Sequence, residues 1–295
     1  MSRFSVTQRT PNTVTWPWLV GSGALMIVCW SLLWFTRTYW NPLFFFGLWT
    51  GATLFVRALQ GEDPLPIPRQ FLLMLLSVPM WWWFELVNEF VHNWTYQGGE
   101  VYSAQAYLLF ATLAFSTVVP ALDTTWKALF GIGKLVRVPR SPAGMAWVGW
   151  EIAMGVVTQA LVFILPAYFY PFVWVAPFLV VDGIAGLLGG PNLLSEVSGR
   201  RWRLPLLVGL AGMICGFFWE FWNFWAMPKW TYNIPFLHFF QIFEMPVLGY
   251  FGYVPFAWFT FQYVQLAERA YGVVLKRRRQ YPGLHVGRAG KPNPD

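Results

Sequence analysis

Residues 85–96, ELVNEFVHNWTY, and residues 220–232, EFWNFWAMPKWTY, carry the same acid, amide and aromatic triplet in the same order. In each stretch an asparagine follows the glutamate by three positions, and Trp-Thr-Tyr begins six or seven positions after the asparagine. The two glutamates are 135 positions apart, and the same offset separates Pro120 from Pro255. A repeat of this length predicts that two copies of one structural unit make up the chain.

The composition is typical of a protein that lies largely in lipid. Of the 295 residues, 57% are hydrophobic and only 11% are charged, whereas about a quarter of the residues in a soluble domain are charged. Several apolar runs reach the roughly 20 residues that cross a bilayer as a helix. We therefore expect an all-α membrane protein with about eight transmembrane helices, at 16–36, 42–59, 70–92, 104–126, 145–166, 168–189, 205–227 and 237–268.

Together, the repeat and the helices predict two parallel four-helix repeats. The first repeat covers residues 1–140, including an N-terminal tail at 1–15, and the second covers 141–270. Because each repeat has an even number of spans, both start from the same side of the membrane. A basic tail at 271–295, which we expect to be disordered, follows the second repeat.

The positive charges predict the orientation. With eight spans and a cytoplasmic N-terminus, every Lys and Arg except Arg37 and Lys229 falls on the cytoplasmic side. This agrees with the excess of Lys and Arg that cytoplasmic loops of membrane proteins carry. We expect both termini in the cytoplasm and the protein in a bacterial inner membrane. The net charge of +7 and the basic run KRRRQ at 276–280 favour anionic lipid headgroups as partners, with no nucleic acid. The oligomeric state stays open.

Acids inside the predicted spans are candidate functional groups, because an ionisable group in hydrocarbon is costly unless it faces a cavity or a partner. They are Glu85, Glu89, Glu151, Asp182, Glu220 and Glu244.

Two of these acids belong to the repeated motif. Glu85 with Asn88, and Glu220 with Asn223, lie three positions apart, so each pair shares one helical face and forms a polar stripe near the outer end of its helix. The Trp-Thr-Tyr triplets, which include Trp230 and Tyr232, are expected at the outer interface, where such aromatic residues gather. For the triplet alone, a structural anchor is the favoured interpretation.

Glu244 lies in FEMPVLGYFGYVPFAW at 243–258. We expect it in the last helix, next to a break caused by Pro246, because such a break frees carbonyl groups that need a partner or a cavity. The alternative is a protonated side chain that hydrogen-bonds to another helix. For Asp182 we weigh binding a headgroup or carrying a proton against a structural, hydrogen-bonded acid.

Metal and nucleotide chemistry have little support in the sequence. The histidines at 92, 238 and 285 lack ligand spacing, and GIGKL at 131–135 lacks the length and the hydroxyl residue of a phosphate-binding loop. Cys29 and Cys215 lie in apolar segments and are expected to be core residues. We expect no metal and no cofactor.

The order Trp219-Glu220, Trp230-x-Tyr232-Asn233-x-Pro235 and Glu244 resembles the small membrane lycopene cyclase domain. That family also has two related halves. The resemblance covers about 30 residues, and it implies that Glu244 protonates a polyene while Glu220 assists. This chain departs from the family pattern, because it has a single acid before a proline where the family has two adjacent acids after one, and its loop is shorter.

Two classes of function follow. The first is a membrane enzyme that acts by proton donation on an isoprenoid, a carotenoid or another long apolar lipid. The alternative is a non-enzymatic subunit that binds lipid or pigment, or a proton-coupled carrier that uses the same acids. In the enzyme, the catalytic residues are Glu244 and Glu220, and the substrate-binding residues are Asn223, Trp230, Tyr232, Glu85, Asn88 and Asp182.

Overall fold

The computed structural model describes residues 15–61, 67–132, 145–236 and 239–270. The predicted tail before the first helix and the predicted basic tail at 271–295 lie outside these ranges. Of the residues in these ranges, 77% are helical. This confirms the predicted helical class.

Six helices in the described part of the chain are long and apolar enough to cross a membrane. A bent pair, Pro166–Phe172 and Val175–Leu187 at 48°, adds a seventh if it is counted as one span. These helices are compatible with an integral membrane protein, whereas eight spans, the four-helix repeats and the orientation stay predictions. The six are Trp16–Phe35, Asn41–Leu59, Pro68–Val91, Ala104–Gly131, Trp147–Ile164 and Arg203–Asn223.

The chain divides into two compact units, each built from two separate stretches. Unit 1 contains Met1–Ala128 and Ile214–Tyr250, and unit 2 contains Leu129–Met213 and Phe251–Asp295. The long helix α10 (Arg203–Asn223) therefore contributes its first half to unit 2 and its second half to unit 1.

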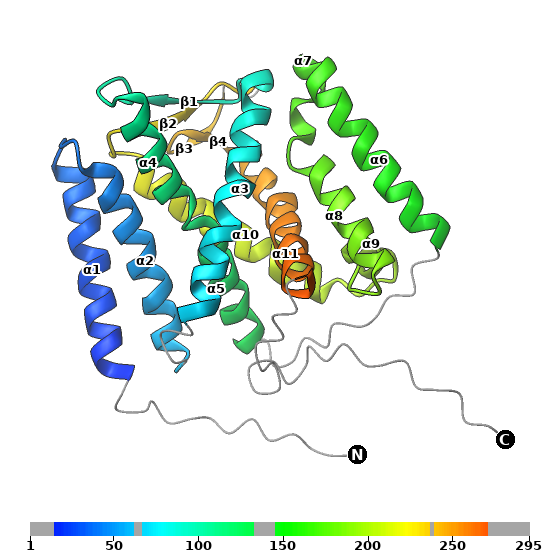
Figure 1. Cartoon of the computed structure of the whole chain (residues 1–295), viewed down its shortest axis with the longest axis horizontal. Helices are drawn as coiled ribbons and strands as arrows, with labels where there is room; N and C mark the ends of the chain where they lie inside the picture. The colour runs from blue at the N-terminus through cyan, green and yellow to red at the C-terminus, as the bar shows by residue number, and fades with distance from the viewer. Residues whose placement is uncertain (1–14, 62–66, 133–144, 237–238, 271–295) are drawn as a thin grey trace. The chain divides into compact units, whose positions relative to one another are not determined.

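Unit 1 begins with α1 (Thr15–Phe35) and α2 (Asn41–Leu59), which lie side by side (Figure 1). Their backbones touch at Gly51, where a Cβ atom would lie 2.9 Å from the backbone nitrogen of Met26. Only glycine allows such a close approach. The other elements of unit 1 are α3 (Ile67–Val91), β1 (Trp94–Gln97), α4 (Ala104–Phe115), most of α5 (Val118–Ile132), the second half of α10 (Arg203–Asn223), β2 (Lys229–Tyr232), β3 (Gln241–Ile242), β4 (Met245–Pro246) and most of the 3-10 helix η2 (Val247–Gly252).

The predicted span at 104–126 belongs to the candidate span Ala104–Gly131, which is made of two helical segments, because α4 ends at Phe115 and α5 begins at Val118. The break is bridged by Ser77 of α3, which is fully buried. Its hydroxyl donates to the carbonyl oxygen of Phe115 and accepts from the backbone N–H of Val119 at 3.1 Å. This side chain thus takes the place of the helical hydrogen bond between the N–H of Val119 and the carbonyl oxygen of Phe115, so that both groups have a partner in an apolar environment.

We predict that Ser77→Ala destabilises the protein, because it leaves two buried backbone groups without this partner. A stranded buried group costs about 1–3 kcal/mol. Unfolding of the purified protein in detergent, followed by circular dichroism, measures the change. Ser198→Ala is the control, since this exposed hydroxyl bonds only to a carbonyl of its own helix, that of Leu194 at 2.8 Å. Equal stability of the two variants would contradict the bridging role.

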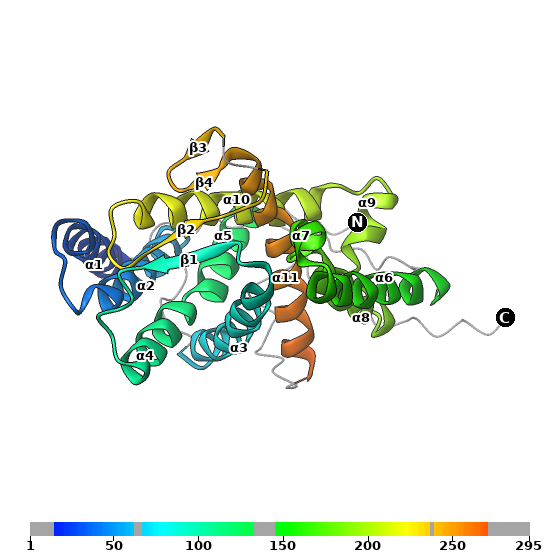
Figure 2. The same cartoon turned by 90° about the horizontal axis from the view of Figure 1, so that it is seen from above.

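The strands of unit 1 join segments that are far apart in the sequence. β1 follows α3, β2 follows α10, and the two pair antiparallel, so that Trp94 faces Tyr232, Thr95 faces Thr231 and Tyr96 faces Trp230. Figure 2 shows β1 and β2 side by side, with the hairpin of β3 and β4 next to β2. The two Trp-Thr-Tyr triplets therefore lie together, and which membrane face they occupy stays a prediction.

The predicted last span at 237–268 is wrong in its first half. Residues 241–246 form the β3–β4 hairpin and residues 247–252 form η2, so the final helix, α11 (Tyr253–Ala270), begins only at Tyr253. The hairpin turns at Phe243, whose φ of 57° is rare for a residue other than glycine. Phe243 packs on the rings of Phe217, Phe221 and Phe224 in α10, at centroid distances of 5.5–5.6 Å.

Unit 2 is helical. Within it α10 and α11 touch at Gly212, where a Cβ atom would lie 2.2 Å from the carbonyl oxygen of Tyr253. The indole N–H of Trp258 in α11 also donates to the carbonyl oxygen of Pro205 in α10, at 2.8 Å. Besides α11 and the first half of α10, unit 2 contains the end of α5, α6 (Met145–Ile164), α7 (Pro166–Phe169), the 3-10 helix η1 (Tyr170–Phe172), α8 (Val175–Leu187) and α9 (Leu193–Ser198).

Candidate functional site

The first copy of the motif builds a carboxylate site between α3 and β1. Because side chains alternate along a strand, Trp94 and Tyr96 point to the same side of β1. Both donate to one carboxyl oxygen of Glu85, the indole N–H at 3.3 Å and the phenol at 2.6 Å. The indole N–H of Trp81, one turn earlier in α3, donates to the same oxygen at 2.8 Å.

The asparagine of the motif fixes where the strand begins. The side-chain amide of Asn88 donates to the carbonyl oxygen of Trp94 at 2.8 Å, and its oxygen accepts from the backbone N–H of the same tryptophan at 3.2 Å. Asn88 therefore acts as a strand partner for one residue. These two hydrogen bonds position β1 along α3 so that the side chains of Trp94 and Tyr96 reach Glu85.

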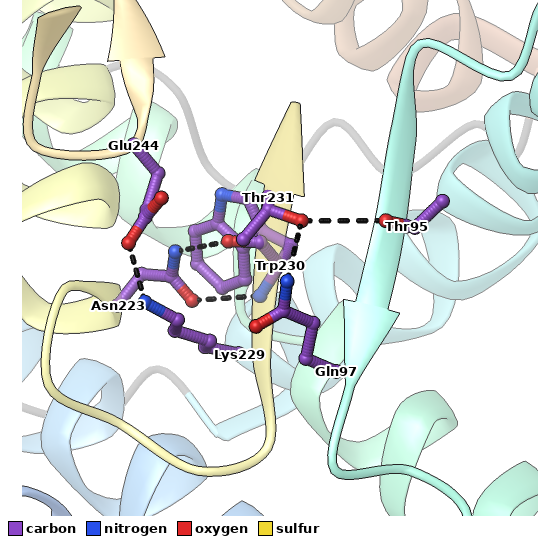
Figure 3. Close-up of polar contacts among 7 residues, drawn as sticks. All are labelled: Thr95, Gln97, Asn223, Lys229, Trp230, Thr231 and Glu244. Atoms are coloured by element: carbon purple, nitrogen blue, oxygen red, sulfur yellow. Dashed lines mark hydrogen bonds and ion pairs between the residues drawn. The ribbon is translucent and has the colours of Figure 1, made fainter. Parts of the chain in front are cut away.

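The second copy repeats this geometry between α10 and β2. One carboxyl oxygen of Glu220 accepts from the phenol of Tyr232 at 2.7 Å and from the indole N–H of Trp230 at 3.3 Å. The amide of Asn223 holds Trp230 through its carbonyl oxygen at 2.7 Å and its backbone N–H at 2.9 Å, as Figure 3 shows. Glu220 and Asn223 are both fully buried.

The two sites share a local two-fold axis that passes between Thr95 and Thr231. These threonines face each other in the register, with hydroxyl oxygens 3.3 Å apart (Figure 3). One difference breaks the symmetry, because Gly216 stands one turn before Glu220 where the first copy has Trp81. Gly216 offers no side-chain donor.

The phenol of Tyr96 holds its proton in this environment. Loss of hydration on burial, reinforced by the charge of nearby Glu85, raises the pKa of Tyr96 well above its usual value. Tyr96 therefore stays a donor at any physiological pH. Donors that converge on a carboxyl oxygen stabilise it as an acceptor, so the described geometry suits an anchor for the strand.

Glu244 is not in a broken membrane helix, which corrects the expectation drawn from Pro246. It lies in the turn of the β3–β4 hairpin, and its carboxylate forms an ion pair with the ammonium group of Lys229 at the start of β2 (Figure 3). About 20% of each side chain is exposed. Its carboxylate is therefore engaged by a cation and is not an isolated acid beside a helix break.

A pocket of about 250 Å³ lies in unit 1, beside the break between α4 and α5. Its wall is mainly apolar. Trp49 joins it to the second carboxylate site, since its ring packs 5.1 Å from that of Trp219, the neighbour of Glu220. The pocket is lined by Phe46, Trp49, Thr50, Thr53, Leu54, Gln70, Phe71, Met74, Thr117 and Pro120.

The predicted site residues do not form one centre. Within unit 1, Glu85 and Asn88 belong to the first carboxylate site, while Glu220, Asn223, Trp230 and Tyr232 belong to the second. Glu244 lies beside β2 through its pair with Lys229. Asp182 belongs to unit 2, where its carboxylate accepts from the backbone N–H groups of Leu193 and Leu194.

Sequence reasoning missed two contributors. Trp81 has no counterpart in the second copy, so the repeat gives no signal for it. Lys229 did carry a signal, since it is one of only two basic residues that the predicted topology leaves outside the cytoplasm. In the structure its ammonium group pairs with the carboxylate of Glu244.

Compared with known proteins, the chain matches no family model, no curated protein and no solved structure. The resemblance to the lycopene cyclase domain stays a prediction.

We predict that Tyr96→Phe and Tyr232→Phe each lower the free energy of unfolding by about 1–3 kcal/mol, because each removes a hydrogen bond to the carboxyl group of the motif glutamate. The measurement is unfolding in detergent. Thr95→Ala is the matched control, since its exposed hydroxyl lies on the other side of the same strand. If Tyr96→Phe costs no more than Thr95→Ala, the carboxylate site does not anchor β1.

Proposed function

We propose that this integral membrane protein binds the long apolar chain of a lipid or isoprenoid in the pocket of unit 1. The observation that carries the proposal is the pocket itself, which lies against apolar helices and measures about 250 Å³. This is near the lower limit of ligand pockets in proteins. It suits several carbons of a chain whose remainder extends into the bilayer.

The lining chemistry supports an apolar chain with a polar group at one point. Phe46, Trp49 and Met74 offer apolar surface, and Phe71 forms an exposed edge. The side-chain oxygen of Gln70 is buried and has no hydrogen-bond partner in the described part of the chain. Since buried acceptors are normally satisfied, a hydroxyl group on the ligand is the complement that this oxygen requires.

Binding fits the pocket better than proton-donating catalysis. None of the residues that line it is acidic. Glu220 is not among the lining residues.

The test is the lipid that the purified protein retains. We predict that Met74→Trp, which fills the pocket, lowers the amount of co-purifying lipid or isoprenoid at least severalfold. Mass spectrometry of the extracted lipids measures this amount. Leu75→Trp is the matched control, because Leu75 is the next residue of α3, is 52% exposed and does not line the pocket. The extract distinguishes isoprenoid from acyl chains. Equal retention by both variants would overturn the proposal.

Acid chemistry on an isoprenoid is the second candidate, favoured by one observation. Glu220 is fully buried among aromatic side chains, and aromatic rings stabilise cations such as a protonated polyene. After the pairing of Glu244 with Lys229, this candidate depends on Glu220 as the proton donor.

Expression in a lycopene-accumulating host tests this candidate. If Glu220 protonates a polyene, the wild type and Glu244→Gln change the pigments, whereas Glu220→Gln does not. Chromatography of the pigments is the measurement. Unchanged pigments with the wild type would exclude the cyclase reaction.

A further inference from the structure

Unit 2 contains two buried carboxyl groups that share one location. Glu151 in α6 is 5% exposed and Asp182 in α8 is completely buried. The amide nitrogen of Asn192 lies 2.7 Å from Oε2 of Glu151 and 3.2 Å from the carbonyl oxygen of Asp182, which places the two acids next to each other, and their carboxyl groups interact directly. Two ionised carboxylates cannot form a hydrogen bond, and two negative charges at this separation repel strongly in a medium of low dielectric constant. The contact therefore requires one proton.

The surrounding donors indicate which residue holds the proton. One oxygen of Asp182 accepts from the backbone N–H of Leu193 at 2.7 Å and also from the amide of Gln262. Its other oxygen accepts from the N–H of Leu194 at 3.0 Å. Donors to both oxygens stabilise the ionised form of Asp182.

Glu151 has a different environment. Its Oε2 accepts from the amide of Asn192 at 2.7 Å, whereas its Oε1 is buried and receives no hydrogen bond from a donor in the described part of the chain. A buried oxygen without a partner is costly. A proton on Glu151 reduces this cost, because the carboxyl group then becomes a donor and the neighbouring carboxylate of Asp182 is its acceptor.

The rest of the site is fixed around this pair. Asn192 reaches Glu151 and the carbonyl oxygen of Asp182 with its amide, while its oxygen caps α9 at the N–H of Ser195, 2.7 Å away. Gln262 of α11 also donates to the carbonyl oxygen of Pro191 at 2.8 Å.

No basic side chain contacts either acid in the described residues of α6, α8, α9 and α11. The other charged groups on these elements are Glu196, which pairs with Arg201 at 2.9 Å, Glu268, and Arg269, which donates to the carbonyl oxygen of Leu188 at 3.3 Å.

We propose that Glu151 and Asp182 form a proton-binding site, in which one proton resides on Glu151 and is donated to the carboxylate of Asp182. Release of this proton leaves two negative charges between α6 and α8, so occupancy of the site is coupled to the packing of these helices. A buried acid that exchanges a proton is the basic component of proton-coupled transport in membranes. The site contains no residue of the lipid pocket, so it goes beyond the proposed function and is tested separately from it.

The test is infrared difference spectroscopy of the full-length protein in detergent or lipid. The wild type must show a protonated-carboxyl C=O band that shifts in D₂O and disappears reversibly as the pH is raised. Glu151→Gln must remove this band while the fold is retained, because glutamine still donates to Asp182. Asp182→Asn must keep the band and shift its frequency. Glu244→Gln is the control and leaves the band unchanged.

An unchanged band in folded Glu151→Gln would overturn the proposal, as would its loss in Asp182→Asn alone. If Glu151→Gln does not fold, Gln262→Leu provides the second test. It removes one donor from Asp182, which makes Asp182 a stronger acceptor for the proton on Glu151 and lowers the frequency of the band. A band with the wild-type frequency in Gln262→Leu would overturn the proposal as well.

Discussion

The pairing of β1 with β2 is the constraint on which unit 1 depends, because it joins the first 128 residues to the segment that starts at Ile214. An asparagine of the preceding helix hydrogen-bonds to the backbone of each strand, and aromatic side chains of the strand donate hydrogen bonds to a glutamate of the same helix. A glutamate that would be costly to bury without partners thus accepts hydrogen bonds that hold a short strand in place. Without such anchors, two four-residue strands would be marginally stable.

The sequence predicted the membrane class and the repeated motif because both depend on local composition and spacing. It also predicted correctly that Glu85 and Asn88, and Glu220 and Asn223, share a helical face. It did not predict that the two Trp-Thr-Tyr triplets pair as strands, because Trp and Tyr next to an apolar helix are also typical of a membrane interface. Pairing depends on a contact between segments far apart in the chain, and the local pattern carries no signal for it.

Glu244 shows why an apolar run is ambiguous. Phe, Ile, Met, Val and Leu around Pro246 fit a kinked membrane helix as well as a short hairpin, and periodicity does not separate the two over so few residues. The hairpin is held by Phe243, whose ring packs against α10. It is also held by Lys229, which pairs with Glu244 and lies fifteen positions before it in the chain. The break at Ser116 and Thr117 was hidden in the same way, since its bridging group, Ser77, lies in another helix.

The carboxylate sites also bear on how the chain is made. The donors to Glu85 all lie between Trp81 and Tyr96, and Trp230 and Tyr232 follow Glu220 within a dozen residues. Each acid can therefore acquire these partners soon after its own segment leaves the ribosome. Insertion of α3 into the bilayer need not wait for synthesis of the second half, and the pairing of the strands can follow as a late step of assembly.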